Sequence, residues 1–124
     1  MNTHELYREI EASSEVLAAS QHRQVQLLLE KCLQHMLNAK NAIQKTEYAN
    51  KHYAISRATN ILTYLRMCLN FQDPSALELS SQLDALYVFI SKSLVTASLK
   101  NDARHIDQAT DVLKMVKDGW DNIA

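Results

Sequence analysis

The scarcity of glycine and proline is the feature that most limits what this chain can fold into. The 124 residues include one glycine and one proline, whereas average usage is about 7% glycine and about 5% proline. Because turns and strand boundaries draw on these two residue types, the chain has few places at which to reverse direction. Strong helix formers such as Leu, Ala, Gln, Lys and Glu are abundant instead. The composition therefore predicts an all-α protein made of a few long helices.

The spacing of the apolar residues divides the chain into an arm and a helical bundle. From residue 20 onwards they recur at steps of three and four, whereas in residues 1–19 the pattern is short and interrupted by serines. Four long helices joined by short connections predict a single domain, residues 20–124, folded as an antiparallel up-down four-helix bundle. Residues 1–19 are expected to form a mobile N-terminal arm. The expected helices span about 20–44, 47–70, 74–99 and 103–122.

Residues that commonly cap helix N-termini mark the helix boundaries. Ser20, Thr46 and Asp73 precede the first three helices, and Asn101 or Asp102 precedes the fourth. Their side-chain oxygens are expected to accept hydrogen bonds from backbone N–H groups that have no partner within the helix. The only proline follows Asp73 at the first helical position, where its missing N–H costs nothing.

Charge and hydropathy exclude several classes of function. Thirteen basic and fourteen acidic side chains give a net charge of −1. Because no run of Lys and Arg is present, the sequence lacks the electrostatic footprint of a protein that binds nucleic acid or lies on a membrane surface. No apolar run approaches the ~20 residues that span a bilayer, and the acidic N-terminus does not resemble a signal peptide. We therefore expect a cytoplasmic protein that neither binds nucleic acid nor inserts into a membrane.

The reactive residue types show no pattern typical of an active site. Cys32 and His35 are three apart on one helix and Cys68 could face them from the next, but pairs such as C-x-x-C or H-E-x-x-H are absent. The only glycine is Gly119, which excludes a glycine-rich phosphate loop. None of the five histidines is paired in sequence with an obvious nucleophile. The sequence predicts a protein that is not an enzyme, holds no metal or cofactor and buries both cysteines as small apolar groups.

Two neighbouring helices carry more apolar residues than one buried face needs. On the third helix a second apolar set lies roughly opposite the core face, and on the second helix the second set is largely aromatic. Because aromatic residues and methionine are enriched where proteins bind one another, these outer sides predict a groove for a partner. Alternatively, a twist of the bundle makes part of the second side internal. The core face of the third helix is Leu83, Leu86, Ile90 and Leu94, and the predicted partner-binding residues are Tyr53, Tyr64, Met67, Phe71, Val88, Ser91, Val95 and Leu99.

Residues spread over all four helices form a pattern that is typical of a known family. They are Tyr7, Ala19-Ser20-Gln21-His22, Val25, Leu28-Leu29, Leu69-Asn70, Leu83, Leu86-Tyr87, Leu94, Ala97, Asn101-Asp102, Ile106, Leu113 and Trp120. Their joint spacing resembles the FliS family, the flagellin-specific export chaperones of bacterial flagellar assembly. The chain departs from the family at Asp73-Pro74-Ser75, where members often have Gly-Gly, and at Val88, where an aspartate commonly follows the tyrosine of the third helix.

The resemblance implies a function. It implies a chaperone that binds the disordered C-terminal segment of flagellin in the cytoplasm, prevents its premature polymerisation and supports its secretion by the flagellar export apparatus. Tyr7, in the arm, would then act as a cover or clamp at the binding surface, and components of the export apparatus would be further partners. The alternative is a homo-oligomeric adaptor or structural protein that uses the same surface for self-association. The expected oligomeric state is a monomer or a weak homodimer.

Overall fold

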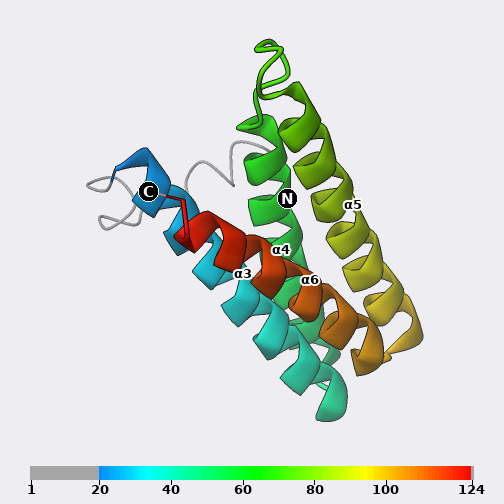
Figure 1. The fold of residues 1–124 in the computed structure, drawn as a ribbon. Helices are drawn as coiled ribbons and strands as arrows, with labels where there is room; N and C mark the ends of the chain where they lie inside the picture. The colour runs from blue at the N-terminus through cyan, green and yellow to red at the C-terminus, as the bar shows by residue number, and fades with distance from the viewer. Residues whose placement is uncertain (1–19, 124) are drawn as a thin grey trace.

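The fold is all-α in the part of the chain that the structure describes, residues 20–123. In the computed structural model these residues form α3 (Gln21–Gln44), α4 (Tyr48–Met67), α5 (Leu77–Lys100) and α6 (Ala103–Asp121). Each helix packs antiparallel against the next, and α6 closes the ring by packing against α3 (Figure 1). The predicted up-down four-helix bundle is confirmed. The predicted arm, residues 1–19, lies outside the described residues.

The core lies where the inner faces of the four helices meet. Its side chains come from the predicted three-and-four spacing, and fully burying a large apolar side chain stabilises a fold by about 1.5–3 kcal/mol. Every helix contributes to this cluster. The largest fully buried side chains are Leu29, Met36, Ile61, Leu62, Ile90, Leu94, Ile106, Leu113 and Cys32.

The two cysteines have different environments. Cys32 is fully buried, and its Sγ donates a hydrogen bond to the carbonyl oxygen of Ala58 at 3.6 Å. Burial raises the pKa of the Cys32 thiol, so it remains a neutral packing group. Cys68 is exposed. The prediction that both are buried is wrong for Cys68, because α4 ends at Met67 and Cys68 lies exposed at its C-cap.

The structure confirms Ser20 as the cap of α3 and Asp102 as the cap of α6, whereas the predicted caps Thr46 and Asp73 are wrong. The Ser20 hydroxyl accepts a hydrogen bond from the backbone N–H of Arg23 at 3.2 Å. Thr46 instead adopts a left-handed backbone conformation, with φ of 55°, and its hydroxyl donates to the Lys45 carbonyl. Glu47 therefore occupies the N-cap of α4, without a side-chain cap bond.

The connection between α4 and α5 uses its polar side chains locally. The Asp73 carboxylate accepts hydrogen bonds from the backbone N–H of Ser75 at 3.0 Å and from its hydroxyl at 2.8 Å. These bonds to Ser75 lower the pKa of Asp73. Because the carboxylate closes this turn, α5 begins only at Leu77, with Ala76 at the N-cap. The prediction that Asp73 caps α5 is therefore wrong.

A buried lysine fastens the start of α4 to the end of α5. Lys51 is 4% exposed, and its Nζ donates to the Ser98 carbonyl at 3.0 Å and to Asn101 Oδ1 at 2.8 Å. The same ammonium lies 4.9 Å from the centre of the Tyr48 ring. Carbonyl groups at a helix C-terminus carry partial negative charge, so a cation there stabilises α5.

Replacing Lys51 by methionine is expected to lower the free energy of unfolding by about 1–3 kcal/mol, because two acceptors lose a charged donor. Urea denaturation followed by circular dichroism measures the change. The matched control is Lys100→Met, which alters an exposed basic residue in the last turn of α5 and should change stability by less than about 0.5 kcal/mol. Equal losses in the two variants would contradict the fastening role of Lys51.

Candidate functional site

An apolar strip on α5 faces away from the bundle core. Val88, Ser91, Val95 and Leu99 follow one another at steps of three and four, so they share one edge of the helix. Val88 and Ser91 are half-buried, whereas Val95 is 49% and Leu99 80% exposed. We call these four residues the outer strip. Its C-terminal half is open to solvent.

The outer strip borders α4 along a polar wall. The border is fixed by the ion pair between Arg66 Nε and Asp84 Oδ1, 2.7 Å apart, and Asp84 lies one turn before Val88. On α4, Thr63 and Thr59 precede Arg66 on the same edge. Their hydroxyls donate at 3.0 Å to carbonyl groups of their own helix. A partner can therefore approach this wall without leaving these two donors unpaired.

The aromatic side of α4 points towards α3 instead. Tyr53 is 60% exposed and lines a cavity of about 380 Å³ together with α3 residues that include Asn38 and Asn41. The Arg57 guanidinium carbon lies 5.0 Å from the centre of the Tyr53 ring. The structure therefore does not bring Tyr53 and the outer strip into one groove.

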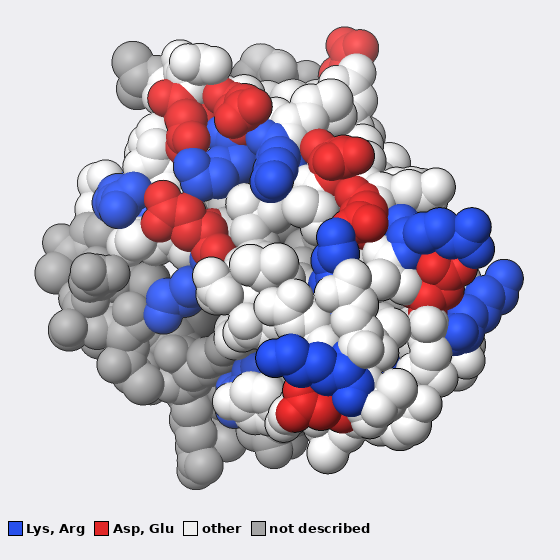
Figure 2. All heavy atoms as spheres, turned by 90° about the horizontal axis from the view of Figure 1, so that it is seen from below, with Lys and Arg blue, Asp and Glu red and all other residues white. Residues whose placement is uncertain are grey.

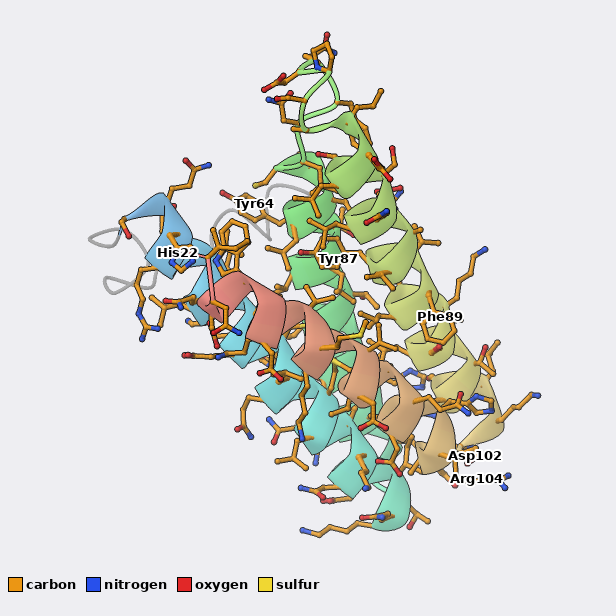
Figure 3. All side chains as sticks on the ribbon, in the orientation of Figure 1. His22, Tyr64, Tyr87, Phe89, Asp102 and Arg104 are labelled. Carbon is orange, nitrogen blue, oxygen red and sulfur yellow. The ribbon has the colours of Figure 1, made fainter. Side chains whose placement is uncertain are left out.

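The other predicted aromatic and methionine positions are spread over the upper end of α4. Tyr64 packs partly buried against the core, Met67 at the end of α4 is 57% exposed, and Phe71 in the following connection is 45% exposed. Tyr64 and the exposed Phe89 lie on opposite sides of the α4/α5 pair in Figure 3. Tyr7 lies outside the described residues.

An apolar cleft between α5 and α6 was not predicted. It has a volume of about 260 Å³, and its lining contains no charged side chain. Leu83 and Leu86, which were assigned to the core, are only half-buried and line this cleft. The full lining is Leu29, Leu79, Gln82, Leu83, Leu86, Tyr87, Met115, Val116, Gly119, Trp120 and Ile123.

The cleft exists because α5 and α6 diverge from their short connection. Figure 1 shows the two helices close together at that connection and apart at their other ends, where α6 runs towards the start of α3. In agreement, Ser80 is the one buried residue in the first ten positions of α5, and the others lie between Tyr87 and Ala97. The first turns of α5 therefore keep apolar side chains that α6 does not cover, and Leu79 is 54% exposed.

The chain's only glycine lies in the lining of this cleft. Gly119 is inside α6 and has no positive φ, so the backbone does not require glycine there. A Cβ added at this position would meet no atom within 4 Å. A glycine within a helix costs about 0.5–1 kcal/mol relative to alanine. In the sequence Gly119 served only to exclude a phosphate loop, whereas a glycine that the backbone does not require is the one signal there that points to this cleft.

Gly119→Ala is expected to raise the free energy of unfolding by up to about 1 kcal/mol, because alanine favours the helix and clashes with nothing. Thermal and urea denaturation measure the difference. Ala109→Gly, at a fully buried position of the same helix, is the reverse change and should destabilise. A loss of stability in Gly119→Ala would show that the cleft is closed in solution.

The charged groups of the surface are mixed in sign. On the face shown in Figure 2, Lys and Arg side chains alternate with Asp and Glu rather than forming a patch of one sign. A further cavity of about 470 Å³ lies between α3 and α6, with Lys40 Nζ and Asp107 Oδ1 paired at 2.7 Å on its lining. Such a surface offers no strong field to attract a highly charged ligand.

The buried reactive groups are held in their neutral forms. Burial, with smaller contributions from the neighbouring Cys32 and Cys68, raises the pKa of Tyr87 to about 12. Within residues 20–123, no group of three or more His, Cys, Asp or Glu side chains is placed to hold a metal ion. None of the four described helices is long and apolar enough to cross a membrane.

Comparison with known proteins assigns this chain to a family. The sequence model of the family described as "Flagellar protein FliS" matches residues 3–124. The chain belongs to the FliS family. The resemblance inferred from the joint spacing of residues over four helices is thereby confirmed.

Several curated relatives carry the name of a flagellar secretion chaperone. "Flagellar secretion chaperone FliSB" of Pseudomonas aeruginosa is 31% identical over 118 residues, which cover 95% of this chain and 92% of the relative. "Flagellar secretion chaperone FliS" of Escherichia coli is 30% identical, over 92% of this chain and 83% of the relative. The protein of the same name from Vibrio cholerae is 29% identical, over 94% of this chain and 85% of the relative. FliS membership thus supports a role in flagellar export for a bundle whose candidate sites are apolar.

Proposed function

We propose that the protein is a cytoplasmic export chaperone that binds the disordered C-terminal segment of flagellin. FliS relatives named as flagellar secretion chaperones support a role with an exported flagellar client. The observation that carries the proposal is the outer strip, because Val95 and Leu99 are strongly exposed on a helix whose opposite face already forms core. In a soluble protein such an apolar surface usually marks a binding site.

The client segment binds as an amphipathic helix against the outer strip. Its apolar side packs on Val88, Val95 and Leu99, and the small Ser91 between them allows close approach. The polar wall of α4 lies beside it, with hydroxyls that are already paired within their helix. A second apolar anchor of the client enters the α5/α6 cleft, which has no charged lining residue.

Binding of this kind protects the client and remains reversible. A flagellin segment held on the chaperone is not available to pair with another flagellin, so polymerisation is prevented before export. Because a disordered segment loses conformational entropy when it folds on binding, affinity stays modest for the area covered, and release to the export apparatus remains accessible. Tyr7 in the arm, Tyr53, Tyr64 and Met67 on α4 and Phe71 in the following connection supply further contacts to the client, outside the outer strip.

Co-purification with flagellin tests the proposal. The tagged chaperone is mixed with full-length flagellin and with flagellin that lacks its C-terminal segment, and the fraction retained is measured. The proposal predicts retention of the full-length protein and loss with the truncated one. Equal retention of both proteins would place the binding site elsewhere on flagellin, and retention of neither would remove flagellin as the client.

Self-association through the outer strip is the second candidate, and the 80% exposure of Leu99 is the observation that favours it. Multi-angle light scattering of the isolated chain separates the two. A monomer or weak homodimer that binds flagellin supports the chaperone. A tight dimer that dissociates only when the strip is altered supports a homo-oligomeric adaptor.

A further inference from the structure

The end of α6 is tied to the start of α3 by a reciprocal pair of contacts. Trp120 Nε1 donates to the carbonyl oxygen of His22 at 3.0 Å, and His22 Nε2 lies 2.8 Å from the carbonyl oxygen of Trp120. Because a carbonyl only accepts, His22 Nε2 carries the hydrogen. The imidazole and indole rings are also stacked, with centroids 5.0 Å apart and an interplanar angle of 13°. These three contacts join residues 98 positions apart.

Trp120 has a second role, because it also lines the α5/α6 cleft. Its neighbours in the lining are apolar and incompletely covered, including Met115 at 57%, Ile123 at 50% and Leu79 at 54% exposure. Burying such side chains against one another is favourable by about 25 cal/mol per Å². The hydrophobic effect therefore draws the end of α6 towards the first turns of α5, which would close the cleft.

The contacts with His22 oppose this closure. They hold the end of α6 on α3 at the side away from the first turns of α5 (Figure 1). A second tie is the bond from Gln26 Nε2 to Asp121 Oδ1 at 2.8 Å. It is exposed, so water competes for its groups and it holds less strongly than the partly buried His22 pair. His22 itself is not among the residues that line the cleft.

We propose that His22 is a positioning residue that keeps the α5/α6 cleft open by holding Trp120 on α3. The inference rests on the proposed function in that the open cleft receives an apolar anchor of the flagellin segment. The geometry of the client site on α5 and α6 is then set by a residue at the opposite end of the chain. Client affinity depends on His22 although His22 does not touch the client.

The first experiment uses the chaperone without flagellin. Because Trp120 is the single tryptophan of the chain, all indole fluorescence reports on this residue. In His22→Ala the indole moves onto α5, so its emission shifts to shorter wavelength, its quenching by acrylamide falls at least twofold, and binding of the apolar dye anilinonaphthalene sulfonate decreases. His22→Gln retains an N–H donor and restores these signals at least in part. Gln21→Ala, at the exposed neighbouring position, is the matched control and leaves them unchanged.

Two results in His22→Ala would contradict the inference. Unchanged fluorescence in His22→Ala shows that the contact does not position Trp120. A red-shifted, more strongly quenched indole shows that the end of α6 merely frays. If His22→Ala does not fold, His22→Leu, which keeps side-chain bulk but has no N–H donor, is compared with wild type by the same readouts.

The second experiment measures how much flagellin each variant retains. A closed cleft in His22→Ala should weaken retention about tenfold or more, with recovery in His22→Gln. If the wild-type protein does not bind flagellin, the proposed function fails, but the fluorescence experiment still tests whether His22 positions Trp120. If the cleft closes in His22→Ala and flagellin retention is unchanged, the cleft is not part of the client site. The claim that the cleft receives an anchor of flagellin then fails, while the proposed function stands.

Discussion

Leu94→Ala is expected to lower the free energy of unfolding by about 2–5 kcal/mol, the range for removing a large side chain from a packed core. Leu94 is fully buried in α5 and belongs to the core cluster to which all four helices contribute. The lost side chain leaves a cavity that the long helices on either side cannot readily collapse into. Because small domains are stable by only about 5–15 kcal/mol, this one change removes a large fraction of the total. Urea denaturation monitored by circular dichroism measures it.

Leu99→Ala is the matched control for Leu94→Ala. It makes the same chemical change five residues later on the same helix, at a side chain that is 80% exposed. Its effect on stability should be less than about 0.5 kcal/mol, while flagellin retention should fall. Comparable destabilisation in the two variants would mean that the outer strip is part of the core, and the division of α5 into an inner and an outer side would be lost.

Val95→Asp should abolish co-purification with flagellin while leaving helical content and the melting temperature nearly unchanged. Val95 is 49% exposed, so an aspartate there remains hydrated in the free protein. Under a bound apolar helix the carboxylate would be buried without a partner, which costs about 3–5 kcal/mol. That cost corresponds to a loss of about 100-fold or more in affinity. Pull-down and titration calorimetry with flagellin measure the loss.

The control for Val95→Asp is Ala85→Asp, which adds the same charge at an exposed position on another edge of α5. It should retain flagellin. If Val95→Asp unfolds the protein, Val95 belongs to the core. If it folds and binds as wild type does, the outer strip is not the client surface.

The helices themselves were predictable because they depend on local chemistry. One glycine and one proline leave few turns, and the three-and-four spacing selects the face of each helix that is buried. Ser20 was predicted as a cap because a serine oxygen can reach the nearby backbone N–H of Arg23. Thr46 and Asp73 were mistaken as caps, because the same oxygens can equally serve a turn.

The placement of the surfaces was less predictable. A helical wheel gives two apolar sides for α4 and α5 but does not state which neighbour each side meets. In the structure the Arg66–Asp84 pair turns a polar edge of α4 towards α5, and Tyr53 faces α3. The groove expected between the two second sides is therefore divided into separate surfaces, of which the outer strip on α5 keeps the predicted residues together.

By itself the sequence determined the all-α bundle, the approximate helices and the resemblance to the FliS family, because periodicity and composition act within each helix. Only the tertiary structure decided that α5 and α6 diverge and leave an apolar cleft beside Gly119. Crossing of helices is set by packing between segments far apart in the chain, as the contact between His22 and Trp120 shows. The spacing of residues within one helix does not predict such a contact, so the cleft could be located only in the tertiary structure.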